Sequence, residues 1–134
     1  MDEKPARVDE ANVQAVVTNA HGDLEAVRKL VDAQPSLANA CWDWGGGDWE
    51  TALGAAAHTG SRDVAEYLID RGARIDVFAA AALGETAIVR AMLDAFPQLI
   101  DATGPHGIPL RVHAEIGGAD DVLALLDTHA SAAS

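Results

Sequence analysis

The sequence TALGAAAHTGSRDVAEYLIDRGARID, residues 51–76, predicts two short helices joined by a turn at Gly60. In its second half, Val64, Tyr67 and Leu68 stand at positions i, i+3 and i+4, which places them on one face of a helix. The first half is rich in alanine and predicts a thin helix that a neighbour can approach closely. We therefore expect a helical hairpin whose second helix buries an apolar stripe.

Three other segments repeat this pattern of a glycine turn followed by an apolar-periodic helix. They are residues 22–31 (GDLEAVRKLV), 84–93 (GETAIVRAML) and 117–126 (GGADDVLALL). The four turn glycines lie 38, 24 and 33 residues apart along the chain. A repeated unit of this size cannot bury its apolar face alone, so the pattern indicates a stack of repeats.

These segments resemble the ankyrin-repeat family, of bacterial type, whose unit of about 33 residues has a hairpin finger followed by two helices. Residues 51–54 (TALG) and 108–111 (IPLR) stand where the family has Thr-Pro-Leu-His, and both lack the motif's histidine. The resemblance covers about residues 9–127 and implies an all-α solenoid of stacked helix-turn-helix units with degenerate fingers. The implied repeats lie at about 9–40, 48–76, 77–102 and 106–130 of a single domain spanning 1–134.

Two irregular spacings mark where the chain departs from a regular array. About five residues are inserted between the first and second units, within the segment 42–49 (WDWGGGDW). About nine residues are missing between the second and third units, so we expect no finger there. The inserted segment holds all three tryptophans of the chain. We expect it at the tip or edge of the first finger.

Composition excludes several function classes. The 134 residues include 9 Lys and Arg against 21 Asp and Glu, a formal charge of −12, which argues against nucleic acid and anionic membranes as partners. Cys41 is the single cysteine, so an intrachain disulfide and a multi-cysteine zinc site are both excluded. The first residues lack the apolar stretch of a signal peptide, and no run approaches the roughly 18 apolar residues of a spanning helix. We expect a cytoplasmic monomer.

By resemblance to the family, a partner would bind on the concave face, which is lined by the fingers and by the two residues before each turn glycine. These pairs are Ala20 with His21, His58 with Thr59, Ala82 with Leu83, and Glu115 with Ile116. Tryptophan is enriched at interaction hot spots, although one or two of these rings could instead fold back and cover the first helix pair. The residues predicted to bind a partner or ligand are Trp42, Asp43, Trp44, Asp48, Trp49, His58, Thr59, Leu83, His106 and Glu115.

Three hypotheses about function follow. The first is a protein-protein interaction module anchored by the tryptophan segment. The alternative is a small-molecule binding protein or minor enzyme, with a pocket between that segment and His58, Leu83 and His113. The third is an acidic protein that blocks a basic partner, whose association would weaken as ionic strength rises.

The residues that carry chemistry favour binding over catalysis. His58 beside Asp48 or Asp43 would form an acid-base pair, but a histidine that only hydrogen-bonds a partner explains the same pattern. We expect His113 to be a partly buried core residue with its polar atoms hydrogen-bonded, and His106 to lie in a tight turn.

Glu50, Glu115, His21 and Cys41 are further candidates for chemistry, and we expect an inert Cys41 because no Lys or Arg stands beside it to lower the pKa of its thiol. His106 and His113 lie seven residues apart, which does not match the i, i+4 pair of a helical zinc site. The sequence therefore predicts no catalytic residue, no metal ligand and no cofactor.

Overall fold

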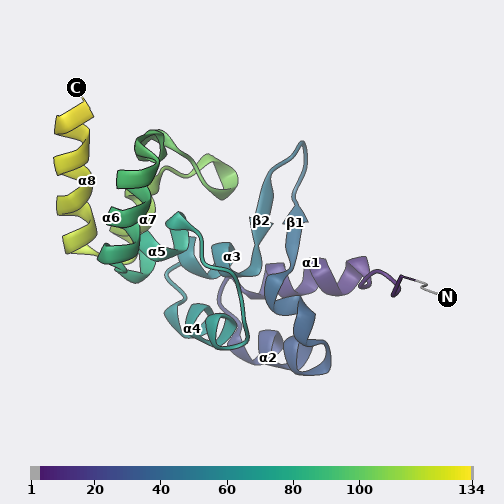
Figure 1. Cartoon of the computed structure of the whole chain (residues 1–134). Helices are drawn as coiled ribbons and strands as arrows, with labels where there is room; N and C mark the ends of the chain where they lie inside the picture. The colour runs from purple at the N-terminus through teal and green to yellow at the C-terminus, as the bar shows by residue number, and fades with distance from the viewer. Residues whose placement is uncertain (1–3, 134) are drawn as a thin grey trace.

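The computed structural model of the chain describes residues 4–133, which form four successive helix pairs stacked in sequence order (Figure 1). The helices are α1 (Glu10–Asn19), α2 (Leu24–Ala33), α3 (Ala52–His58), α4 (Arg62–Asp70), α5 (Val77–Leu83), α6 (Thr86–Ala95), α7 (Leu110–Ile116) and α8 (Asp120–Ala133). The first helices of the pairs pack in the order α1, α3, α5, α7, while α2 packs on α4 and α6 on α8. This arrangement confirms the predicted all-α stack.

Small residues make the layer of first helices thin. In α3, alanines and Leu53 are buried, and α5 buries Ala79, Ala80 and Ala81 completely. Short side chains let neighbouring helices approach closely, so these helices are covered from both sides of the stack. None of the helices within residues 4–133 has the length and apolar character needed to cross a membrane.

The second helices bury the stripes predicted from their periodicity. Val64, Tyr67 and Leu68 of α4 are all buried, in a core shared by the first two pairs. A second core joins the third and fourth pairs around Leu93 of α6 and Val122 of α8. Each stripe is therefore covered by the neighbouring pair, as a repeat stack requires.

The inserted tryptophan segment forms a β-hairpin that projects from the stack between α2 and α3 (Figure 1). Strand β1 (Cys41–Asp43) pairs antiparallel with β2 (Trp49–Thr51). At the tip, the Asp43 carboxylate accepts hydrogen bonds from the backbone N–H groups of Gly45 (2.8 Å) and Gly47 (2.9 Å). The prediction that this segment lies at the first finger is confirmed.

The third unit lacks a finger, as its short spacing predicts. Residues 71–76, between α4 and α5, contain a turn and no strand. The fourth unit does have a loop in the finger position, in which Thr103 bridges to Pro109 and the 3₁₀ turn η3 (Pro105–Gly107) forms the tip. Because nothing from the third unit intervenes, η3 contacts β2 directly. Two further 3₁₀ turns, η1 (Pro35–Asn39) and η2 (Pro97–Asp101), follow α2 and α6.

Candidate functional site

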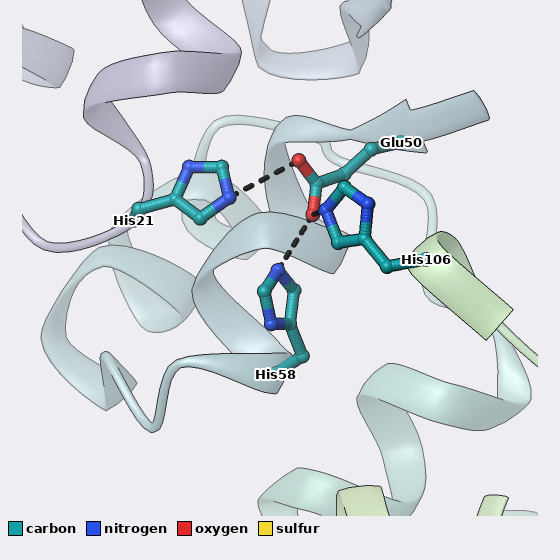
Figure 2. Close-up of side chains that lie close together, drawn as sticks. All are labelled: His21, Glu50, His58 and His106. Carbon is teal, nitrogen blue, oxygen red and sulfur yellow. Dashed lines mark hydrogen bonds and ion pairs between the residues drawn. The ribbon is translucent and has the colours of Figure 1, made fainter. Parts of the chain in front are cut away.

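Three histidines surround one buried carboxylate where the hairpin, the helix ends and the η3 loop meet (Figure 2). The Glu50 side chain is fully buried. His58 Nε2 is hydrogen-bonded to Glu50 Oε2 at 2.7 Å. His21 Nε2 lies 3.1 Å from Glu50 Oε1, and His106 Nε2 lies 3.2 Å from Glu50 Oε2, both as ion-pair contacts. We call these four residues the His3Glu cluster.

Each member of the His3Glu cluster comes from a different element of the stack. His21 follows α1, His58 is the last residue of α3, and Glu50 is the central residue of β2. His106 lies in η3 with a φ of 61°, a left-handed conformation that turns the chain tip back toward the hairpin. The rings pack edge to face, with centroids 5.2 Å apart for His21 and His58 and 5.2 Å apart for His58 and His106. The cluster thus joins the first, second and fourth units.

A glycine at the start of α3 makes room for the η3 loop. Gly54 stands where the ankyrin motif has histidine, and a Cβ placed on it would lie 3.4 Å from Pro105 and 3.1 Å from the Thr51 hydroxyl. Thr51 caps the helix instead, since its hydroxyl oxygen accepts a hydrogen bond from the Gly54 N–H at 2.8 Å. The start of α3 is therefore capped by Thr51, and the η3 loop that carries His106 packs against it at Gly54.

A second set of hydrogen bonds orients the rings. The Nδ1 atom of His21 lies 3.0 Å from the carbonyl oxygens of both Val17 and Thr18. The Nδ1 atom of His106 lies 2.6 Å from Asp48 Oδ2, and the His106 backbone N–H donates to Asp48 Oδ1 at 2.8 Å. Since carbonyl and carboxylate oxygens only accept, both Nδ1 atoms carry a proton.

The carboxylates of this region are held in their charged forms. Burial acts to raise the pKa of Glu50, but hydrogen bonds from His58 and from the Trp44 indole N–H, together with the nearby histidines, outweigh it and lower that pKa. The hydrogen bonds from the His106 backbone and side chain lower the pKa of Asp48. The same side-chain bond to Asp48 raises the pKa of His106. The site concentrates negative charge that cations can balance.

His113 lies near the cluster but not in it. It is fully buried in α7, with its ring 5.0 Å from that of Phe78 and its Nδ1 atom 3.0 Å from the Pro109 carbonyl oxygen. Its Nε2 atom has no hydrogen-bond partner within the described residues. Burial is the main cause that lowers the pKa of His113. The prediction of a core histidine is confirmed, although His113 is fully rather than partly buried and only one of its two ring nitrogens has a hydrogen-bond partner within the described residues.

The structure pairs the ionisable groups differently from the acid-base prediction. Asp48 hydrogen-bonds His106 rather than His58, and the Asp43 carboxylate accepts backbone hydrogen bonds in the turn at the hairpin tip. His58 meets Glu50 instead. Asp48 and Glu50 are two residues apart and face the same side of the hairpin, where the two nitrogens of His106 contact both of them.

The three predicted tryptophans divide between the two expected roles. Trp42 packs against the core of the first two units, whereas Trp44 is 38% exposed and Trp49 is 61% exposed. One ring therefore covers the first helix pair, and two are available at the surface of the hairpin.

Other predicted residues lie apart from the cluster. Thr59 is exposed and its hydroxyl donates to the Ala55 carbonyl. Leu83 lines a separate apolar pocket of about 190 Å³ with Ile116, and Glu115 is exposed beside it. Cys41 is exposed, and partial burial followed by the charge of Glu50 raises the pKa of its thiol, which agrees with an inert group.

His21 and Glu50 belong to the cluster although neither is among the residues predicted from sequence to bind. A signal for His21 exists, because His21 and His58 occupy the end of the first helix in successive units, and stacking brings equivalent positions together. Glu50 carries no local signal, since an acidic residue in a polar finger is usually exposed.

A model of the family described as ankyrin repeats (many copies) matches residues 13–69, which include most of α1 and all of α2, the hairpin and α3. The match identifies ankyrin repeats in this chain. No curated protein matches it. Ankyrin repeats are generally protein-protein interaction modules, so this ankyrin stack belongs to a class of proteins that bind partners.

Proposed function

We propose that this ankyrin-repeat protein acts in the cytoplasm as a monomer that binds another protein through its concave face and its tryptophan-bearing hairpin. The observation that carries the proposal is Trp49, which is 61% exposed on a strand. Tryptophan supplies a large rigid contact area at small entropic cost. An exposed tryptophan on a fixed finger is therefore suited to fill an apolar pocket of a partner.

Several contacts fix the hairpin in place. Asp43 closes its tip, Asp48 hydrogen-bonds the η3 loop, and Glu50 anchors β2 in the interior. A preorganised contact residue loses less conformational entropy on binding than a mobile one does. These contacts hold the backbone on either side of Trp49 in place.

The charge of the chain supports a partner with a basic rim. The net charge is −12, and acidic residues outnumber basic ones by more than two to one. Complementary charge speeds association and sets partner choice, and salt screens it. We expect the association rate to fall steeply as salt increases, while the dissociation rate depends mainly on Trp49.

Site-specific photo-crosslinking tests this proposal. A photo-reactive phenylalanine analogue replaces Trp49 in one variant and Phe96 in a matched control, because Phe96 is an exposed aromatic (55%) at the end of α6. We expect one protein to be crosslinked from position 49 and not from position 96. The affinity of that protein for Trp49→Ala should fall at least about 30-fold, the effect of a hot-spot residue. Equal affinity for wild type, Trp49→Ala and Phe96→Ala would refute the hairpin as the anchor.

A groove between the hairpin and the η3 loop favours a second candidate, the binding of a small organic cation. The groove has a volume of about 460 Å³ and is lined by Trp49, Phe78, Asp48 and Asp76 among others. Aromatic faces and carboxylates together attract cations, and the volume falls in the range of small-ligand sites. Titration with a quaternary ammonium compound should quench Trp49 fluorescence in wild type and not in Phe78→Ala, and identical titration curves would exclude this candidate.

A further inference from the structure

We propose that His21, Glu50, His58 and His106 together bind one divalent transition-metal ion of the zinc class. Each of the four residues offers one ligand atom, and these atoms all lie within 4.8 Å of one another (Figure 2). Imidazole nitrogen and carboxylate oxygen are ligands that Zn²⁺ takes in proteins, in sets of four. The proposal departs from the expectation, drawn from sequence, that the chain holds no metal.

The distances from Glu50 to the three rings are close to those around a four-coordinate ion. Zinc bonds of about 2.0–2.1 Å in a tetrahedron place neighbouring ligand atoms about 3.3 Å apart. The observed distances from Glu50 oxygens to the Nε2 atoms are 3.1 Å for His21, 2.7 Å for His58 and 3.2 Å for His106. The widest separations in the cluster, of up to 4.8 Å, would have to close by about 1.5 Å around the ion, and the partly exposed rings of His21 and His106 can make that movement.

The hydrogen bonds around the rings select the nitrogen that faces the ion. The Nδ1 protons of His21 and His106 point at oxygens that only accept. In the neutral ring the lone pair is then on Nε2, the atom directed at the centre of the cluster. A backbone carbonyl or carboxylate behind a histidine is the usual second partner of a metal-bound ring. Asp48 and the Val17 carbonyl therefore occupy the positions that such a site requires.

The rings and the carboxylates crowd one small region. His58 lies between His21 and His106, with ring centroids 5.2 Å from each. A divalent ion at the centre of the cluster would balance the charge of the buried Glu50 carboxylate and of the neighbouring Asp48 carboxylate.

The position of the cluster gives the ion a structural role. His21 and His58 end helices of the first two units, Glu50 is on the hairpin, and His106 is on the loop of the fourth unit. One ion bound by all four would fix the hairpin and the η3 loop to the stack. Ligand binding to the folded state alone raises stability with ligand concentration, so the melting temperature should rise with added metal.

Zinc affinity of the untagged full-length chain tests the assignment. The protein is treated with a chelator and titrated with Zn²⁺ in competition with a chromophoric chelator. Wild type should bind one equivalent, and His106→Ala and Glu50→Gln should bind at least about 100-fold more weakly, because loss of a ligand exceeds the roughly 10–100-fold effect of its outer partners. Asp48→Asn should fall within that 10–100-fold range.

Two matched controls separate this site from adventitious binding. His129→Ala removes a histidine of α8 that contacts Asp94, and Cys41→Ser removes the single thiol. Both should bind zinc as wild type does. Mg²⁺ should not displace Zn²⁺, because it prefers all-oxygen sites. Substitution with Co²⁺ should give the intense visible absorption of a four-coordinate ion in wild type and the weak absorption of an octahedral ion in Glu50→Gln.

Two results would overturn the proposal. One is equal zinc affinity of wild type, His106→Ala and Glu50→Gln, which would mean that the ion binds elsewhere. The other is failure of wild type to compete for zinc at all, which would leave the ionic network as the state of the cluster. Circular dichroism of each variant checks the fold, and His106, a partly exposed loop residue, decides the outcome even if Glu50→Gln unfolds.

Discussion

Replacement of Leu68 by alanine should destabilise the stack by about 3–4 kcal/mol. Leu68 is fully buried in α4, within the core that joins the first two units. The change removes three carbon atoms, and at about 0.8 kcal/mol for each buried methylene the lost transfer free energy is about 2.4 kcal/mol. The cavity left in a packed core adds to this, and buried leucine-to-alanine changes as a class cost about 2–5 kcal/mol.

Urea unfolding followed by the helical circular dichroism signal measures this free energy. The matched control is Ile88→Ala, which removes the same number of carbons from a side chain of α6 that is 38% exposed. The control should lose less than about 1 kcal/mol. If Leu68→Ala also loses less than about 1 kcal/mol with an unchanged denaturant slope, the buried face of α4 has been assigned wrongly.

Three further substitutions test other contacts by urea unfolding. Gly117→Ala should cost about 3 kcal/mol, because a Cβ there would overlap the carbonyl group of Ala82. Tyr67→Phe should cost about 1 kcal/mol, since it removes the hydroxyl that donates to Asp32 at 3.0 Å. Burial lowers the pKa of His113, so below its ordinary value of about 6.5 the unfolded chain takes up a proton that the folded chain does not. Stability should therefore fall as the pH drops from 7 to 5.5, by up to about 1.4 kcal/mol per pH unit more than in His113→Leu.

For each of these three predictions, one result would contradict the reasoning. A wild-type unfolding midpoint for Gly117→Ala would mean that α5 and α7 can separate at no cost. If a double-mutant cycle of Tyr67→Phe with Asp32→Ala shows no coupling energy, the hydrogen bond between these two residues does not contribute to stability. Parallel stability profiles against pH for wild type and His113→Leu would show that the buried ring does accept a proton.

The helix pairs were predictable because their signals are local. Apolar residues at i, i+3 and i+4, alanine-rich first helices and glycine turns all act within a few residues, and Val64, Tyr67 and Leu68 are buried as this pattern requires. The missing finger of the third unit and the hairpin of the inserted segment followed from spacing alone. The sequence did not determine which tryptophans are exposed and which one is covered, because the packing of Trp42 depends on a neighbouring helix pair.

By itself, the sequence determined a stack of helix pairs, their order and the loops that interrupt them, since each depends on neighbours along the chain. Tertiary structure alone decided that His21, Glu50, His58 and His106 share one site. These residues span 86 positions, and their meeting depends on stacking, on the absent third finger and on the left-handed turn at His106. Such a cluster has no periodicity to detect, because its members are brought together by packing between units and not by their spacing within one.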